Sequence, residues 1–560
     1  MDVFKQKIVE AIKKETGLEQ INLEIPPNQE LGDYAFPCFE LAKKWKKNHA
    51  EIAQILKDKI KLAGVKTEIK GAYLNFFIDY KKKNEYLLRE VLKKRNKYGS
   101  STKKNQNVMI EFFHANTHKA VHIGHIRNIC LGESIARILE FSGYDVIRVN
   151  YQGDIGPHVA KCMWGILNLK LKMPEKNKLR WLGGIYAKAN EKSNENAGAE
   201  EEIRVMTKQL YEGDKKLTAL WIRTRKWCLD DFNKLYKEFN VKFNRLYFES
   251  EVEKSGKEIS RKLVDEGITK VSDEAIIADL EQYGLGILVL VRNDEVALYG
   301  AKDLGLSQLK LKEYRKIDKS LHVVGKEQEF YFKQLFKIFE LMKSPLSCRS
   351  YHIIYELVML PEGKMSSREG NLVLYYDLID RLLDVTRKEV EKRNKNMPKN
   401  KLEKIANQIA FGALKFSMAN RENNRVLIFD MKKALDLEGE TGPYIQYANT
   451  RINSILKRYG KNVSGNVNLS LLTHENETQL INILQKFPNT IEECAVHYKT
   501  NLLARYLLDL SQALNRFYHS CPILQEKEEL KLARLVLIKT VQTVISQGLY
   551  LLGIETPERM

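Results

Sequence analysis

The stretch at residues 111–128, EFFHANTHKAVHIGHIRN, constrains the fold of this chain more than any other. An apolar run at 108–113 precedes its H-x-G-H element, and an amphipathic helical pattern beginning at Ile126 follows it. A buried strand, a loop and a helix in this order can hold nucleotide phosphates against the N-terminus of the helix. Gly124 carries no Cβ, so a nucleotide can approach the backbone closely there. The stretch therefore predicts a phosphate-binding loop on a parallel sheet.

The two imidazoles of this element, His122 and His125, can donate hydrogen bonds to a phosphoryl group as charge develops on it. Metal binding is one alternative, because His114 and His118 lie close by in the sequence. Closed structural zinc sites usually recruit cysteine as well, and no cysteine lies in this cluster, so no protein-bound metal is expected. A second alternative is hydrogen-bonded histidines at an ordinary helix start. The element needs a second motif to carry a functional prediction.

That second motif is KMSSR, between Gly363 and Gly370, and it follows an apolar run at 353–360. It combines a cation with hydroxyls and flanking glycines, so it can close over a triphosphate and neutralise it. The members in question are Lys364, Met365, Ser366 and Ser367. A solvated surface turn is the alternative for such a loop taken alone. Strands and helices alternate over the stretch between the two motifs, which favours a shared nucleotide site.

Composition limits the partners and the location. The chain has 560 residues and a net charge of +20, which favours nucleic acid or an anionic membrane surface as a partner, with general solubility as the alternative. No window of about 18 apolar residues occurs, so no membrane span is expected. Of the two polyanions, nucleic acid is the expected partner and a membrane is not. The seven cysteines are scattered without a C-x-x-C pair, and the N-terminus is unlike a secretory signal. These features indicate a cytoplasmic protein with reduced thiols.

Three domains are expected from length and periodicity. We predict an α+β N-terminal domain at 1–104, a doubly wound, Rossmann-like α/β domain at 105–430 with insertions at about 165–250, and an all-α C-terminal bundle at 431–560. Within the second domain, strands at 145–151, 285–291 and 321–325 are expected in one parallel sheet. The stretch 172–202 is polar and is expected to be a weakly ordered insertion.

With both motifs placed, the chain resembles the class I arginyl-tRNA synthetases along nearly its whole length. HANTHKAVHIGHIRN fits the arginine-specific form of the first class I motif, and KMSSR resembles the second. Further matches are NYQGDIG at 150–156, LYGAKD at 298–303, VGKEQ at 324–328 and ETGPYIQYANTR at 440–451. The resemblance implies that arginine and ATP form arginyl-adenylate, and that the arginyl group then passes to the 3′-terminal adenosine of tRNA(Arg).

The resemblance also implies residue roles. Ser367 stands where class I enzymes commonly place a second lysine, and arginine enzymes often carry a compensating lysine before H-x-G-H, a position that Lys119 matches. The expected catalytic residues are therefore His122, His125, Lys119 and Lys364. The expected ATP-binding residues are His122, Gly124, His125, Lys364, Met365, Ser366 and Ser367, with Mg²⁺ carried by ATP.

Arginine must be distinguished from lysine, and carboxylates placed for bidentate pairing read a guanidinium best. By resemblance, the arginine-binding residues are Glu111, Asn116, Glu249, Tyr299, Asp303 and Gln328. For each acidic residue, a surface ion pair is the alternative. The expected tRNA contacts are Asn75 and Phe76 at the tRNA elbow, and Tyr444, Tyr447, Asn449 and Arg451 at the anticodon. A monomer is expected. The alternative functions are a class I synthetase for another amino acid and a catalytically inactive tRNA-binding paralogue.

Overall fold

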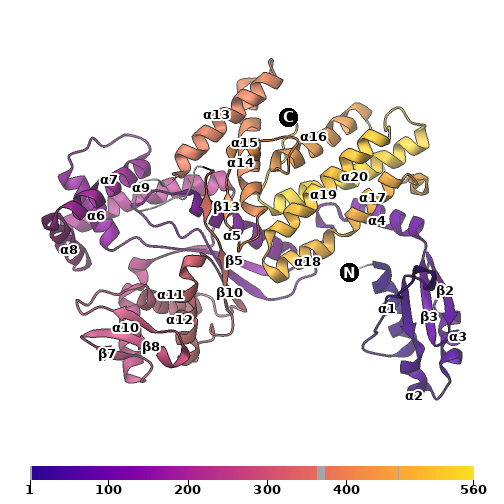
Figure 1. The fold of residues 1–560 in the computed structure, drawn as a ribbon, viewed down its shortest axis with the longest axis horizontal. Coiled ribbons are helices and arrows are strands. Elements are labelled where there is room, and N and C mark those ends of the chain that lie inside the picture. The colour runs from indigo at the N-terminus through magenta and orange to yellow at the C-terminus, as the bar shows by residue number, and fades with distance from the viewer. Residues whose placement is uncertain (1–2, 362–372, 464–465) are drawn as a thin grey trace. The chain divides into compact units, whose positions relative to one another are not determined.

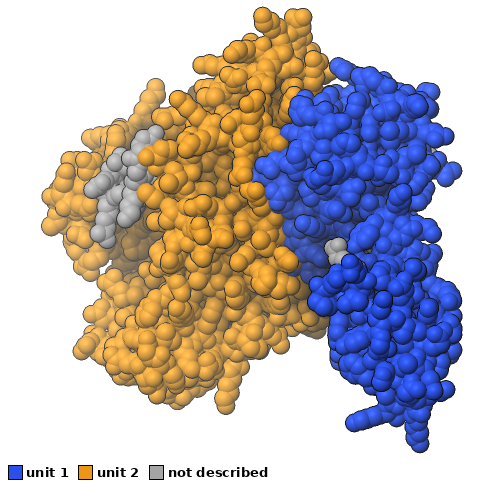
Figure 2. Space-filling view, turned by 45° about the vertical axis from the view of Figure 1, so that its right-hand side comes forward, with its two compact units in different colours: residues 1–99, 448–492, 506–547 blue, residues 100–447, 493–505, 548–560 orange. Residues whose placement is uncertain are grey.

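The computed structural model describes residues 3–361, 373–463 and 466–560. These divide into two compact units (Figure 2). One unit comprises residues 1–99, 448–492 and 506–547, and the other comprises 100–447, 493–505 and 548–560. The KMSSR motif lies outside the described residues, and with it the predicted site residues Lys364, Met365, Ser366 and Ser367. No helix within the described ranges is both long and apolar enough to cross a bilayer.

A five-stranded parallel sheet forms the centre of the larger unit, in the order β11-β10-β4-β5-β6. The strands are β4 (Asn107–Glu111), β5 (Asp145–Gln152), β6 (Arg245–Phe248), β10 (Lys319–Gly325) and β11 (Ser350–Tyr355). The chain proceeds from β4 to β5 and β6 on one side, whereas β10 and β11 extend the sheet on the other. The order therefore reverses between β4 and β10, and ligands of such sheets bind at the carboxyl ends of the strands at this point. The predicted doubly wound sheet is confirmed.

Helix α5 (Ile123–Phe141) is the helix that follows the first motif, and it lies beside β5 and β10 (Figure 1). It is buried along most of its length, including the polar residues Arg127, Asn128 and Glu133. Glu133 accepts from Arg137 of the same helix at 2.7 Å and from Arg148 on β5 at 2.8 Å, and Arg127 donates to the backbone oxygen of Glu356 at 2.6 Å. The pairing explains how a helix with this many polar side chains can be central to the unit.

The strand expected at 285–291 does not join the parallel sheet. It forms β9 (Ile287–Val291), which pairs antiparallel with β8 (Ala275–Asp279), itself antiparallel to β7 (Lys270–Ser272). Helices α10 (Glu249–Asp265) and α11 (Tyr299–Glu313) pack together and contribute to the same core cluster as this small sheet. An apolar run indicates a buried strand but does not identify its partner, which is why the expectation failed.

The stretch at 172–202 is not weakly ordered either. It holds α7 (Lys178–Glu195) and the start of α8 (Ala197–Tyr211), which follow α6 (Pro157–Asn168). Leu179, Leu182 and Ile185 are buried at helical spacing among many polar residues. The longer α9 (Lys215–Phe239) follows them. Helices α12 (Glu329–Leu341), α13 (Tyr375–Arg393) and α14 (Lys399–Ala419) complete the main elements of the unit before residue 430.

The smaller unit contains an antiparallel sheet in the order β1-β3-β2, with β1 (Tyr34–Pro37), β2 (Val65–Lys70) and β3 (Tyr73–Ile78). Helices α1 (Val3–Thr16) and α3 (His49–Lys59) share its core, which includes Ile8, Phe36 and Leu74. The unit also takes in α4 (Tyr80–Lys94), α17 (Glu475–Gln485), and most of α19 (Thr500–Ser520) and α20 (Glu528–Leu551). Helices α16 (Gly442–Tyr459) and α18 (Phe487–His497) each have residues in both units. The α+β N-terminus and the helical C-terminus are as predicted.

Candidate active site

The first motif caps α5. His122 is the N-cap residue, and its Nδ1 accepts a hydrogen bond from the backbone N–H of Gly124 at 3.2 Å. His125 Nδ1 accepts from the backbone N–H of His122, also at 3.2 Å, and the two ring centroids lie 3.8 Å apart. A neutral imidazole that accepts at Nδ1 carries its proton at Nε2. Both rings therefore offer an Nε2–H donor at the N-terminus of the helix.

Burial keeps these two rings neutral. It lowers the pKa of His122 to about 4, with a further contribution from the nearby Lys119 ammonium. It also holds the pKa of His125 well below its usual range, with His122 as the next cause. Gly124 leaves room for the His122 ring, because a Cβ at position 124 would lie 3.0 Å from His122 Cε1 and Nδ1. The glycine therefore permits the folded-back His122 ring as well as a close approach of a ligand.

The loop that leads from β4 to α5 has a strained backbone. Phe113, His114 and His118 adopt positive φ values of 85°, 51° and 62°, which side chains other than glycine rarely do. Buried partners hold two of these residues: Asn128 Oδ1 accepts from Phe113 N at 2.5 Å, and Asn150 Oδ1 accepts from His114 N at 3.1 Å. Such strain persists only where the surroundings impose it, and it concentrates at functional sites.

His118, one of the four histidines of the zinc alternative, is engaged by protein groups. His118 places Nε2 2.7 Å from Thr224 Oγ1 and Nδ1 2.9 Å from Thr117 Oγ1, so both of its nitrogens have protein partners. Within the part of the chain that the structure describes, no three His, Cys, Asp or Glu side chains form a group that could hold a metal ion. His118 instead fixes the loop to α9.

Residues 373–375 are hydrogen-bonded to the start of the first motif. The backbone N–H of Ile123 donates to Val373 O at 3.2 Å, and that of Tyr375 donates to Val121 O at 2.9 Å. His122 and Leu374 form an antiparallel bridge between these bonds. The described residue that follows the KMSSR segment is therefore hydrogen-bonded to the start of α5, although the two lie far apart in the sequence.

Lys119 lies in the same loop and is partly buried. Burial lowers the pKa of its ammonium, and the Glu249 carboxylate opposes this shift. Its Nζ lies 5.3 Å from the centroid of the Tyr186 ring, a cation–π distance. The lysine is thus held near His122, whose pKa it lowers, and near the acidic side of the site.

Asn116 and Glu249 meet over Gly153, at the end of β5. Asn116 Oδ1 accepts from Gly153 N at 3.0 Å, and a Cβ on that glycine would lie 2.7 Å from Asn116 Oδ1 and 3.2 Å from Glu249 Oε1. Glu249 Oε2 pairs with Lys302 Nζ at 2.5 Å. The start of α10 is fixed by Asp154, which accepts from Ser250 N at 2.9 Å and from Ser250 Oγ at 2.7 Å. The structure therefore brings these two predicted arginine ligands together.

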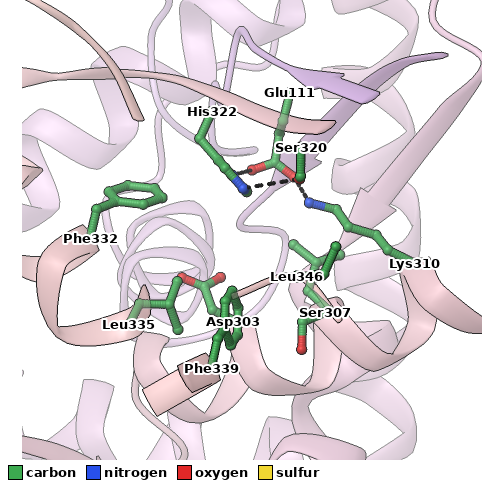
Figure 3. A pocket seen from close by; sticks show the side chains of 11 residues that line it. Glu111, Asp303, Ser307, Lys310, Ser320, His322, Phe332, Leu335, Phe339 and Leu346 are labelled. Atoms are coloured by element: carbon green, nitrogen blue, oxygen red, sulfur yellow. Dashed lines mark hydrogen bonds and ion pairs between the residues drawn. The ribbon is translucent and has the colours of Figure 1, made fainter. Parts of the chain in front are cut away.

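Glu111 ends β4 and is fully engaged by other residues (Figure 3). Its Oε2 lies 2.5 Å from Lys310 Nζ, and its Oε1 lies 3.2 Å from His322 Nδ1. These groups outweigh the effect of burial and hold the pKa of Glu111 well below its usual range. Each oxygen accepts from a protein group, so Glu111 forms a buried ion pair in this structure, and its role in arginine binding stays a prediction.

Asp303 lies across a small cavity from this network (Figure 3). The cavity measures about 20 Å³, which is room for one water, and Asp303 is also partly exposed to solvent. The hydroxyl of Tyr331, on α12, donates to Asp303 Oδ2, and the rings of Tyr299 and Tyr331 pack edge to face at 5.6 Å. Burial raises the pKa of Asp303 to about 7. Tyr299 and Gln328 themselves are exposed, so neither encloses the carboxylate.

The predicted RNA contacts are placed unevenly. Asn75 and Phe76 lie in the central strand β3 with 3% and 0% of their surface exposed, and Phe76 belongs to the core. On α16, Tyr444 and Tyr447 are partly buried, and Asn449 is buried with Oδ1 accepting from Ser546 Oγ at 3.1 Å. The guanidinium of Arg451 lies 4.2 Å from the Tyr518 ring centroid. The burial of Asn75 and Phe76 leaves little surface for a partner.

Comparisons with known proteins cover the whole chain. Residues 87–431 match the family described as tRNA synthetases class I (R), catalytic domain. Residues 2–78 match the arginyl tRNA synthetase N terminal domain, and residues 445–560 match the DALR anticodon binding domain.

Individual relatives agree with these matches. The arginine–tRNA ligase of Bdellovibrio bacteriovorus is 35% identical over 96% of this chain and 93% of its own length. That of Clostridium perfringens is 34% identical over 100% of both. The solved arginyl-tRNA synthetase of Thermus thermophilus superposes with a TM-score of 0.77 at 27% identity, over 100% of this chain and 99% of that one. The chain therefore belongs to the class I arginyl-tRNA synthetases, ligases that use ATP to join arginine to tRNA.

Proposed function

We propose that arginine is activated at the carboxyl end of β4, between the start of α5 and the pocket formed by α10, α11 and α12. The observation that carries this proposal is the hydrogen bonding of His122 and His125, each of which accepts at Nδ1 and so carries its proton at Nε2. Mg·ATP is the substrate. The arginine carboxylate attacks the α-phosphorus, the bond to the β-phosphate oxygen breaks, and pyrophosphate leaves.

The nucleotide end of the site uses neutral donors and cations. His122 and His125 donate to phosphoryl oxygens, and Lys119 and Lys364 add positive charge as the α-phosphate becomes five-coordinate. Gly124 lets the nucleotide approach, and Met365, Ser366 and Ser367 close over it. The hydrogen bonds that tie Val121 and Ile123 to residues 373–375 support this arrangement, because they bring the chain that follows the KMSSR segment to the start of α5.

The arginine end uses Asp303 and Glu249 for the guanidinium, with Tyr299 lining the same pocket, and Glu111 and Asn116 for the α-amino and carboxylate ends. Gln328, at the carboxyl end of β10, can reach the same substrate. The arginyl group then passes from the adenylate to a ribose hydroxyl of the terminal adenosine of tRNA(Arg), with AMP as the leaving group. For the RNA, Asn75, Phe76, Tyr444, Tyr447, Asn449 and Arg451 stay proposed contacts, as do the domain boundaries 1–104, 105–430 and 431–560. We also propose a monomeric, cytoplasmic enzyme.

The test is charging of tRNA with each radiolabelled amino acid in turn. We expect arginine to be transferred and lysine not. Transfer of lysine, or of no amino acid, would contradict the proposed pocket. Omission of Mg²⁺ should abolish charging, and light scattering should give the mass of one chain.

A further inference from the structure

Two of the three carboxylates of the proposed arginine pocket form ion pairs with lysines. Glu111 is paired with Lys310 at 2.5 Å, and Glu249 is paired with Lys302 at 2.5 Å. Asp303 forms no ion pair within the described ranges of the chain. Because ionisation of a partly buried carboxylate without an ion pair is unfavourable, a cationic ligand would stabilise its charged form.

The groups around Asp303 determine whether its carboxyl group is neutral or ionised. The ionisable groups that face it come from every element packed around the pocket: Glu111 on β4, Tyr151 on β5, Glu249 on α10, Lys310 on α11, His322 on β10 and Tyr331 on α12. Burial and the two glutamates favour the neutral form, whereas the Tyr331 hydroxyl and Lys310 favour the ionised form. Of these, the Tyr331 hydroxyl is the group that touches the carboxylate directly.

A second observation points to a ligand at the same place. The hydroxyl of Tyr151 is buried and has no hydrogen-bond partner within the described residues. Its pKa is raised well above the usual range, by burial first and then by Asp303, Glu249 and Tyr331. A phenol oxygen can accept a hydrogen bond, and a guanidinium has N–H donors on three nitrogens. A guanidinium at Asp303 could therefore satisfy Tyr151 as well.

We propose that Tyr331 is a positioning residue that aims the Asp303 carboxylate and sets its ionisation, so that arginine binding drives one proton from Asp303 to the solvent. This inference rests on the proposed role of Asp303. In the empty pocket the carboxyl group holds a proton part of the time. When the guanidinium binds, the O–H bond of the acid breaks, the proton leaves to water, and the carboxylate keeps the electron pair to accept the guanidinium N–H groups.

The direct test is calorimetric titration of the full chain with arginine, without ATP or tRNA, in two buffers of different ionisation enthalpy. Because the pKa of Asp303 lies at about 7 in the free protein, binding should release more than half a proton at pH 6.5 and close to none at pH 8.5. No proton release at pH 6.5 would overturn the inference. This measurement needs no variant, so it holds even if a substitution impairs folding.

Tyr331→Phe then tests the role of the hydroxyl. Without its donor the Asp303 pKa rises, so arginine affinity should fall ~10-fold at pH 7 and recover to within ~3-fold of wild type at pH 8.5. A purely structural role predicts the same loss at both pH values, which would contradict the proposal. Tyr247→Phe is the matched control, because its hydroxyl donates to Glu313 at 2.9 Å in the same unit and does not contact Asp303.

The outcome separates this inference from the proposed function. Wild-type charging of tRNA with arginine, together with a large loss in Asp303→Asn, would support the proposed pocket whatever the proton count. If charging and that loss are seen while arginine binding is independent of pH between 6.5 and 8.5, only the proton linkage fails. If Asp303→Asn binds arginine as wild type does, the pocket assignment itself fails.

Discussion

The two ends of the site achieve their electrostatics in opposite ways. At the start of α5 the working side chains are neutral imidazoles, which burial keeps unprotonated and which hold each other through bonds within three residues of sequence. In the pocket formed by α10, α11 and α12, the side chains are carboxylates and lysines. Glu111 and Glu249 each pair with a lysine from another element, whereas Asp303 has no ion pair among the described residues. A neutral donor can serve an anionic nucleotide without repelling other cations, whereas an unmatched carboxylate is specific for a cation.

The first prediction concerns the ion pair between Glu111 and Lys310, which a substitution of Lys310 removes. Lys310→Met leaves the Glu111 carboxylate buried without its ammonium partner, and loss of one partner from a buried pair should destabilise the protein by ~3–5 kcal/mol. The measurement is the urea midpoint of the larger unit. Because the pKa of Glu111 is lowered in the folded protein, its stabilisation is present at neutral pH and lost as the pH falls in the acid range.

The control for this prediction is the double variant Lys310→Met with Glu111→Gln. It removes both charges and should recover a large part of the lost stability. Equal midpoints for Lys310→Met and wild type would show that Glu111 is not held by this pair.

The nucleotide side can be broken at Lys119. Lys119→Ala should lower the rate of arginyl-adenylate formation by ~10²–10³, the scale for loss of one donor that acts in the transition state. Arginine affinity should change little, because the interaction grows with charge on the α-phosphate. Rapid quench with labelled ATP measures the rate.

Lys178→Ala is a suitable control for Lys119→Ala, since Lys178 also lies over an aromatic ring, that of Trp227, at 4.6 Å. Restoration of part of the rate by Ser367→Lys in the Lys119→Ala background would indicate that the two positions share one function. An unchanged rate in Lys119→Ala would assign the charge to another residue.

The next prediction concerns Asp303, the carboxylate without an ion pair, and its effect on the use of arginine. Asp303→Asn removes the charged acceptor and should reduce kcat/KM for arginine by ~2–4 kcal/mol. The loss should decrease as the pH falls below about 7, because the wild-type carboxyl group is then protonated as well. Charging rates at limiting arginine from pH 6 to 8.5 measure this. A loss that stays constant over the range would mean that Asp303 is ionised throughout.

The sequence predicted the start of α5 better than it predicted the arginine pocket. The donors at α5 could be predicted because H-x-G-H contains both partners of each bond. The pairs Glu249–Lys302 and Glu111–Lys310 could not, because 53 and 199 residues separate their members and no local pattern joins them. Tyr331 was missed for the same reason. The parallel sheet was predicted from apolar runs, whereas the separate antiparallel sheet at β7–β9 required knowledge of strand partners.

The smallest effect concerns stability, and it sets the two carboxylates of the pocket directly against each other. The pKa of Asp303 is raised from 3.8 to about 7 on folding, so between these values the folded protein binds more protons than the unfolded chain, and stability falls as the pH rises through the window. Asparagine at 303 does not titrate. Asp303→Asn should therefore be more stable than wild type by ~1 kcal/mol at pH 8, and the difference should decrease at pH 5 and disappear only below about pH 4. Glu111→Gln should instead be less stable than wild type at pH 8, because it strands the Lys310 ammonium. Thermal midpoints of both variants at the two pH values decide the matter, and a destabilised Asp303→Asn at pH 8 would show that Tyr331 and Lys310 stabilise the ionised carboxylate by more than its burial costs.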